Sequence, residues 1–177
     1  SMDRIKTETL PTGEVLTYTY GRDGNLESLT GKWNGTTYNY AANIAYTAYG
    51  KLKEINYHNG VKTTYSYYDS ASKPDPANKN RTHSYRLKNI HIQNNRGDII
   101  ADTTYEYDSL DNIVKKDFFD SDSNVYTETF TYDPYNRLES AYCGELYGSK
   151  TYAYNKINNI TEKDDRTYVY GVYPEEG

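Results

Sequence analysis

Residues that commonly do chemistry are few in this sequence, and their spacing does not form a recognisable site. The three histidines, His58, His83 and His91, fall in separate segments without metal-ligand spacing. Cys143 is the only cysteine, and no Gly-x-Ser-x-Gly motif or phosphate-binding glycine loop occurs. The acidic stretch DSDSNVYTE (120–128) lacks the glycine and the glutamate that an EF-hand requires. We therefore expect no catalytic residue, no metal and no cofactor, and a protein that is not an enzyme.

Tyrosine is the side chain whose abundance points to a binding function. The chain has 23 tyrosines among 177 residues, together with one tryptophan and three phenylalanines. Such rings can contact the face of a sugar while the tyrosine hydroxyl forms a hydrogen bond. Trp33, Tyr38 and Tyr40, in the Gly-rich stretch GKWNGTTYNY, are the residues that we expect to contact carbohydrate. The alternative is that most rings build the protein's own core.

Composition excludes two classes of partner. The net charge is -5, whereas a nucleic-acid-binding surface needs a basic face. The sequence has no apolar run near the ~20 residues of a membrane span. Leu, Ile, Val and Phe are scarce, with 9, 10, 6 and 3 copies, so tyrosine is expected to supply most of the core. We therefore expect neither a nucleic-acid partner nor a membrane span.

A Tyr-x-Tyr or Phe-x-Tyr pair recurs along the chain, mostly every 20 to 27 residues. A period of this size is typical of repeat architectures, in which each unit buries its face against its neighbours. One gap, of 40 residues, is interpreted as two units with a degenerate member at 85–90 (YRLKNI). The pairs are Tyr18/Tyr20, Tyr38/Tyr40, Tyr65/Tyr67, Tyr105/Tyr107, Phe130/Tyr132, Tyr152/Tyr154 and Tyr168/Tyr170.

Each unit has the pattern of a β-hairpin. The tyrosines alternate with polar residues, which is the period of a strand with one buried face. Asp, Asn and Gly follow each pair, and these residues accept turn hydrogen bonds or a positive φ. We predict strands at Tyr18–Tyr20, Tyr65–Tyr68, Tyr105–Tyr107, Phe130–Tyr132 and Tyr152–Tyr154. The expected fold class is all-β, with repeated antiparallel hairpins stacked into a curved or spiralling sheet and almost no helix.

The repeat residues are expected to be structural. The paired rings would lie on one face and form cross-strand aromatic pairs, and the Asp, Asn and Gly residues would make the turns. The residues assigned to this structural role are Tyr18, Tyr20, Gly24, Asn25, Tyr105, Tyr107, Asp108, Asn112, Phe130, Tyr132, Asp133, Tyr152 and Tyr154.

The domain organisation follows from the repeats. Residues 1–177 are interpreted as a single array, and residues 70–81, with two prolines and no large apolar side chain, as an exposed loop insertion. Sheet edges need protection, so we expect the array either to self-associate end to end or edge to edge, or to be capped by its terminal segments 3–16 and 168–177.

The repeated motif resembles the YD repeat. The segments YTYGRDGNLESL (18–29), YEYDSLDNIVK (105–115) and FTYDPYNRLES (130–140) are similar to the repeats of Rhs (rearrangement hotspot) proteins, wall-associated proteins, toxin-complex C components and teneurins. Gly21 and Asn155 stand where the family has aspartate, and Arg137 stands where asparagine is commoner.

This resemblance implies a function as well as a fold. In large relatives the spiralling sheet closes into a shell around a toxic C-terminal polypeptide. The resemblance therefore implies a non-enzymatic structural scaffold, a fragment of a larger bacterial protein that is secreted or lies at the cell surface. Its partners would be adjacent repeats or the C-terminal cargo of the parent chain. The alternative is a carbohydrate-binding module that recognises a cell-surface glycan.

Overall fold

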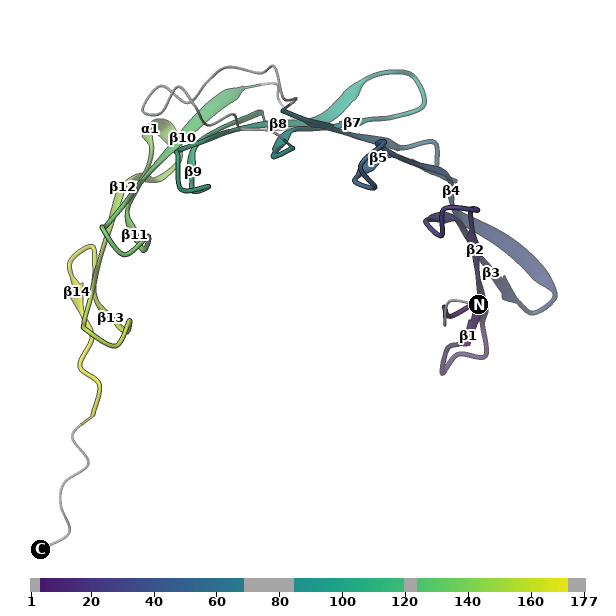
Figure 1. The fold of residues 1–177 in the computed structure, drawn as a ribbon, viewed down its shortest axis with the longest axis horizontal. Coiled ribbons are helices and arrows are strands. Elements are labelled where there is room, and N and C mark those ends of the chain that lie inside the picture. The colour runs from purple at the N-terminus through teal and green to yellow at the C-terminus, as the bar shows by residue number, and fades with distance from the viewer. Residues whose placement is uncertain (1–3, 69–84, 120–123, 172–177) are drawn as a thin grey trace, which may run out of the picture.

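The computed structural model describes residues 4–68, 85–119 and 124–171. Fourteen strands form one antiparallel sheet in which each strand pairs with its neighbours in the sequence. The sheet follows an arch from β1 to β14 (Figure 1). The predicted all-β class is confirmed, since the described part contains a single four-residue helix, α1 (Gly144–Tyr147).

The strands alternate in direction along the arch. They are β1 (Thr7–Thr9), β2 (Val15–Tyr20), β3 (Leu26–Trp33), β4 (Thr36–Tyr46), β5 (Leu52–Tyr57), β6 (Lys62–Tyr67), β7 (Leu87–Gln93), β8 (Ile99–Tyr107), β9 (Ile113–Phe119), β10 (Val125–Tyr132), β11 (Leu138–Cys143), β12 (Gly148–Tyr154), β13 (Ile160–Lys163) and β14 (Arg166–Thr167). The five predicted strands fall within β2, β6, β8, β10 and β12, with Tyr68 one residue beyond β6.

Each repeat is a hairpin whose turn follows a tyrosine. After Tyr107, the amide of Asp108 donates to the carbonyl of Asn112, and the amide of Asp111 donates back to Asp108. Asp111 has φ +75°, a conformation that Gly, Asn and Asp tolerate best. The same pair of bonds recurs in the other repeats, with the positive φ at Gly24, Gly50, Asn136 and Asn158.

The 40-residue gap contains one repeat, so its interpretation as two units is wrong. Within the described residues, β7 is the only strand between the tyrosine strands β6 and β8. Tyr68 and Tyr85 occupy the positions of Asp108 and Asp111, because Tyr85 donates to Tyr68 and has φ +68°. Sixteen residues, 69–84, therefore stand where the other turns have two. The predicted loop at 70–81 lies outside the described residues.

The sheet is a single layer with very little core. Among the described residues, the buried ones are Gly31, Ala41, Thr63, Ala141 and Cys143. The expectation of a tyrosine core is therefore wrong, since the repeat tyrosines are half-buried or exposed.

The expected cross-strand aromatic pairs are also absent from the ladders of the repeat tyrosines. Tyr107 pairs with Ile113 and Tyr132 pairs with Leu138, each an aliphatic residue of the same hairpin. The reason is that a second strand separates successive tyrosine strands, which places them about 9.5 Å apart. Aromatic rings on those strands are too distant to be direct cross-strand neighbours.

The two ends of the arch differ from the predicted caps. At the N-terminal end, β1 pairs with β2 and extends the sheet by one short strand. At the other end β14 pairs with β13, and residues 168–171 lie beyond it without strand structure. Residues 1–3 and 172–177, which belong to the expected caps, lie outside the described part. No described helix is long and apolar enough to span a membrane.

Candidate functional site: the junctions between repeats

The most regular side-chain contacts lie where one repeat meets the next. Adjacent strands of successive repeats meet at β3/β4, β5/β6, β7/β8, β9/β10 and β11/β12, and we call the last four of these pairs junctions. At each junction the last tyrosine of the later strand donates its hydroxyl to the carbonyl of the first residue of the earlier strand. The bonds are Tyr67 to Leu52 (2.7 Å), Tyr107 to Leu87 (2.9 Å), Tyr132 to Ile113 (2.8 Å) and Tyr154 to Leu138 (2.9 Å).

The chemistry of tyrosine explains why the second residue of each pair is never phenylalanine. A carbonyl at the start of a strand needs a donor, and the phenol supplies one across the junction while its ring covers the sheet. Phe130 stands at the first position of its pair, where no such bond is made. The hydroxyl requirement therefore belongs to the second position alone.

A cation accompanies this bond at three of the four junctions. The residue just before the accepting carbonyl is Lys51, Arg86 or Arg137, and its charged group lies over the ring of Tyr67, Tyr107 or Tyr154. The distances to the ring centroids are 5.3, 5.4 and 4.7 Å, within the range of a cation–π contact. Arg4 lies over Tyr20 in the same way at 5.4 Å, before the first complete repeat.

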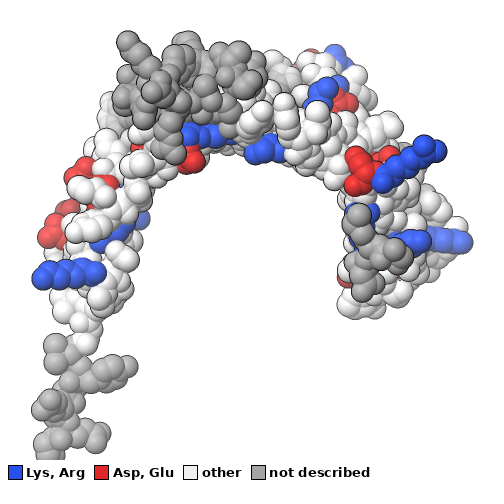
Figure 2. Space-filling model, in the orientation of Figure 1, with Lys and Arg blue, Asp and Glu red and all other residues white. Residues whose placement is uncertain are grey.

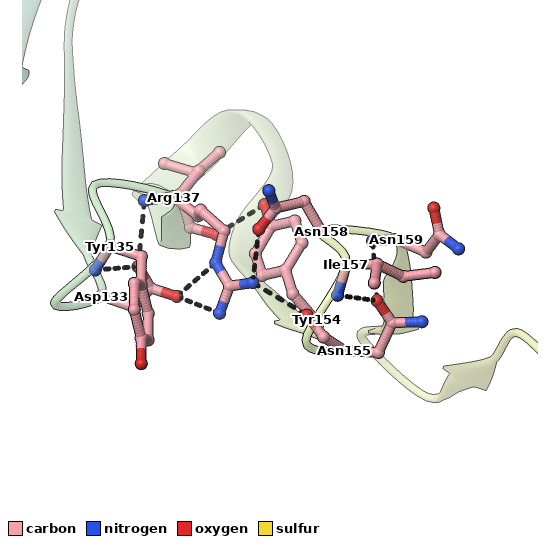
Figure 3. A network of polar contacts seen from close by, with 9 residues as sticks. Asp133, Tyr135, Arg137, Tyr154, Asn155, Ile157, Asn158 and Asn159 are labelled. Carbon is pink, nitrogen blue, oxygen red and sulfur yellow. Dashed lines mark hydrogen bonds and ion pairs between the residues drawn. The ribbon is translucent and has the colours of Figure 1, made fainter.

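The network around Arg137 is the most complete of these (Figure 3). Its guanidinium forms two bonds of 2.7 Å with Asp133 in its own turn. It also donates to the backbone carbonyl of Asn155 and to the side-chain oxygen of Asn158, both at 3.0 Å, in the following turn. Arg137 thus connects two successive turns, a geometry that suits the planar fork of arginine.

Related contacts connect other turns. Arg86 donates to the carbonyl of Asp108 at 2.9 Å and forms an ion pair with Asp111. Asn112, which precedes the accepting residue Ile113, donates to Asn136 at 3.2 Å. Each donor reaches the following turn, so the turns of the array are joined in series.

Three of the turns are fixed by a short polar side chain at their first residue, which is Asp108, Asp133 or Asn155. One oxygen of Asp108 accepts the amides of Leu110 and Asn112, and its other oxygen accepts the side chain of Asn112. Asp133 accepts the amides of Tyr135 and Arg137 in the same way. Asn155 accepts the amides of Ile157 and Asn159, so an amide oxygen can replace the carboxylate.

These contacts determine the electrostatics of the site. Desolvation opposes the ionisation of Asp108, but hydrogen bonds from Asn112 and Leu110 outweigh it and hold the pKa of Asp108 below its usual value. For Asp133 desolvation acts in the same direction, and bonds from Arg137 and Tyr135 lower its pKa overall. Burial raises the pKa of Tyr107, so its hydroxyl keeps its proton and remains a donor.

The structure places the remaining repeat residues at equivalent positions. Tyr20 ends β2 and donates to the carbonyl of Ile5 at 2.9 Å. Gly24 has φ +85°, and Asn25 is bonded to Asp23 through both its backbone amide and its side chain. The first members of the pairs, Tyr18, Tyr105, Phe130 and Tyr152, lie two residues earlier in their strands.

The Tyr38/Tyr40 pair does not occupy the strand end that the other pairs occupy. Strand β4 continues through a bulge at Asn43, which has φ +51°, to Tyr46 before the next turn. Trp33 pairs with Thr36, and Gly31 pairs with Tyr38, so Trp33, Tyr38 and Tyr40 share one face of the β3–β4 hairpin. They are 47, 42 and 42% exposed, and the Tyr40 hydroxyl donates to Glu14.

Among the ion pairs of the sheet, one contains a histidine, His91, and the sequence did not indicate it. His91 lies directly across from Asp102, with 2.8 Å between its Nδ1 and a carboxylate oxygen. Its Nε2 faces the side-chain oxygen of Gln93 at 3.3 Å rather than a serine or a cysteine. The described residues contain no cluster of His, Cys, Asp and Glu that could hold a metal. His83 and residues 120–123 lie outside the described part.

Comparisons with known proteins support the fold. No protein-family model matches the sequence, and neither does a curated protein. A chain in the crystal structure of TcdB2-TccC3-Cdc42 superimposes with a TM-score of 0.70 at 20% identity, over 92% of this chain and 9% of that chain. A chain of the Photorhabdus luminescens Tc holotoxin pore matches with a TM-score of 0.70 at 21% identity, over 89% of this chain and 8% of that chain. This chain therefore has the fold of a small part of those much longer chains.

Proposed function

We propose that this chain is a non-enzymatic structural segment of a YD-repeat shell, in a bacterial surface or exported toxin-delivery protein. It would form part of a wall that encloses a polypeptide cargo, with adjacent repeats as its other partners. The observation that supports this most is the series of junction bonds from β5/β6 to β11/β12, which holds a one-layer sheet together without a core.

The ends and the surface of the sheet fit such a role. Within the described residues, β1 and β14 each pair with one strand, so each presents an edge to which a further repeat can be added. Lys, Arg, Asp and Glu are mixed along the arch in Figure 2, without a face of one sign in that view. The fold match to a small part of two toxin-complex chains agrees with a wall segment.

Electron microscopy of this chain expressed with its flanking coding sequence tests the proposal. We expect a hollow shell in which these fourteen strands form an arc of the wall, with additional polypeptide density inside. A chain whose coding sequence adds no further repeats, or a particle without an internal cavity, would contradict it.

A carbohydrate-binding module is the second candidate, and one observation favours it. Trp33, Tyr38 and Tyr40 share a face and are partly exposed, as an aromatic platform for a sugar requires. Trp33 is the only tryptophan, so its fluorescence reports on this surface alone. Glycan binding there should give a saturable change in emission that Tyr38→Ala weakens, whereas a purely structural wall should give none.

A further inference from the structure

The turn between β7 and β8 carries the tripeptide Arg96-Gly97-Asp98. All three residues are exposed, and Gly97 has φ +87°. The described part of the chain has seven glycines with a positive φ, and Gly97 is the one that stands between a basic and an acidic residue. In Figure 1 this teal hairpin extends from the outer side of the arch. A cationic and an anionic side chain are therefore presented together at an accessible tip.

Asn94 fixes the backbone of this turn. Its amide donates to the carbonyl of Asp98 at 2.9 Å, and its carbonyl accepts the amide of Gly97 at 3.1 Å. Its side-chain oxygen accepts the amides of Arg96 at 2.8 Å and Asp98 at 3.0 Å. Together these hydrogen bonds hold the tripeptide in one backbone conformation, which lowers the conformational entropy that is lost when a partner binds.

The charged groups of the turn remain available to a partner. One carboxylate oxygen of Asp98 accepts the side chain of Asn94 at 2.8 Å, and its other oxygen makes no hydrogen bond or ion pair within the described residues. The guanidinium of Arg96 has no hydrogen bond, ion pair or ring contact with the described part of the chain. A Cβ placed on Gly97 would meet no described atom within 4 Å, so a partner can approach the backbone closely.

Two exposed apolar side chains adjoin the tripeptide. Ile99 and Ile100, the first residues of β8, are 52 and 47% exposed. Neighbouring apolar side chains on a surface are a feature of contact sites, because their burial adds to the affinity that the charged groups provide. The tip therefore combines two charges with an apolar flank.

These groups define the chemistry of the partner. A carboxylate oxygen can complete the coordination of a divalent cation, since Mg²⁺, Ca²⁺ and Mn²⁺ prefer oxygen ligands. A guanidinium forms its strongest contacts with a carboxylate. The complementary surface is therefore a divalent cation with an open coordination position, an acidic pocket, and a space between them that a glycine backbone can enter.

We propose that this turn is a binding site for a cell-surface receptor of the integrin class, whose ligand site has this chemistry and recognises Arg-Gly-Asp. Asp98 would coordinate the receptor's divalent cation, Arg96 would enter its acidic pocket, and Ile99 and Ile100 would lie against the surface around them. The site goes beyond the proposed wall function, because it lies on the outer side of the arch and requires neither a cargo nor a closed shell.

Surface plasmon resonance tests the proposal, with the full chain immobilised and the purified ectodomain of an Arg-Gly-Asp-binding integrin in solution. We expect half-saturation below about 10 µM in Mn²⁺, and at least about tenfold weaker binding in EDTA, because the aspartate contact needs the cation. The linear peptide Gly-Arg-Gly-Asp-Ser-Pro should compete, and the same peptide with glutamate in place of aspartate should not. No saturation by about 100 µM integrin, full binding in EDTA, or no competition by the first peptide would overturn the proposal.

Charge-conserving variants separate specific recognition from general attraction between charges. Asp98→Glu keeps the charge but moves the carboxylate by one methylene, and it should weaken binding at least about tenfold, as should Arg96→Gln. Asp165→Glu, in the exposed turn between β13 and β14, is the matched control and should leave the affinity unchanged. Circular dichroism and urea unfolding verify that each variant keeps the fold. Unchanged binding by Asp98→Glu, or an equal loss in Asp165→Glu, would contradict the assignment to this turn.

Discussion

The junctions β11/β12 and β5/β6 connect successive repeats through different sets of side-chain contacts. In both, a tyrosine hydroxyl donates to the first carbonyl of the neighbouring strand, and a cation lies over the ring. At β11/β12 the cation, Arg137, also joins two turns through Asp133, Asn155 and Asn158. At β5/β6 the insertion replaces the second turn, and Lys51 lines a cavity instead.

The tyrosine bond is present at both junctions, including the one that carries the insertion, whereas the side-chain contact between turns is present only at β11/β12. A repeat can therefore lose its turn acceptor and remain in the sheet, since the ladder and the tyrosine hydroxyl still connect it to its neighbour. Where the contact between turns is lost, Lys51 lines a cavity of about 340 Å³.

We expect the largest difference in unfolding free energy between the two junctions when Arg137 or Lys51 is replaced by alanine. Arg137→Ala removes the ion pair with Asp133 and the bonds to the next turn, and we expect it to lower the free energy of unfolding by about 2–4 kcal/mol. Lys51→Ala removes one ring contact and should cost less than about 1 kcal/mol. Urea unfolding measures both. Equal losses would mean that the contact between turns contributes nothing.

Low pH should destabilise the turns of Asp108 and Asp133, in which a carboxylate accepts the turn amides, and should leave the turn of Asn155 unchanged. Asp108 and Asp133 have folded pKa values below the usual value, so their stabilising effect is complete above the unfolded pKa of about 3.9 and is lost as pH falls through the folded value. We expect hydrogen exchange at the amides of Leu110 and Tyr135 to lose protection in that range relative to the intrinsic rate.

The internal control for this pH effect is the turn of Asn155. Its side chain accepts the amide of Ile157 at 3.0 Å and does not titrate. Protection at Ile157 should therefore persist until the sheet itself unfolds. A simultaneous loss of protection at Leu110, Tyr135 and Ile157 would argue against a local role of the carboxylates.

The smallest effect is expected at the strained turn of the β5/β6 junction. Tyr85 has φ +68°, and the equivalent residues Asp111, Asn136 and Asn158 are types that tolerate this region. In a chain that carries Tyr49→Ala, so that the ring contact between Tyr49 and Tyr85 is already lost, Tyr85→Asn should stabilise by about 0.5–1 kcal/mol. Thermal unfolding tests this, and destabilisation by Tyr85→Asn would show that the tyrosine itself supports the turn.

The local part of this structure was predictable from the sequence. Alternation around Tyr105 and Tyr107 indicates a strand, and Asp108 and Asn112 indicate the turn that follows, because both signals depend on residues a few positions apart. The acceptors of the tyrosine hydroxyls were not predictable. They depend on the register between strands whose contacting residues are 15 to 20 positions apart.

The sequence pattern was misleading at Arg137 and at the Tyr38/Tyr40 pair. Arg137 looked like a departure from the repeat motif, yet it makes the most contacts between two turns. The Tyr38/Tyr40 pair looked like a repeat end, but the bulge at Asn43 moves that end to Tyr46. A recurrence of basic residues just before the strand that follows each turn was the available signal for Arg86 and Arg137.

The central claim is that the strand-end tyrosines Tyr67, Tyr107, Tyr132 and Tyr154 hold successive repeats together through their hydroxyls. The most direct test is urea unfolding of a chain with Tyr107→Phe, Tyr132→Phe and Tyr154→Phe against a chain with Tyr65→Phe, Tyr105→Phe and Tyr152→Phe. The first set removes three junction bonds and should lower the free energy of unfolding by roughly 3–5 kcal/mol in total. The second set removes no hydrogen bond that connects repeats, and we expect a change below about 1 kcal/mol. Equal stability of the two chains would contradict the account.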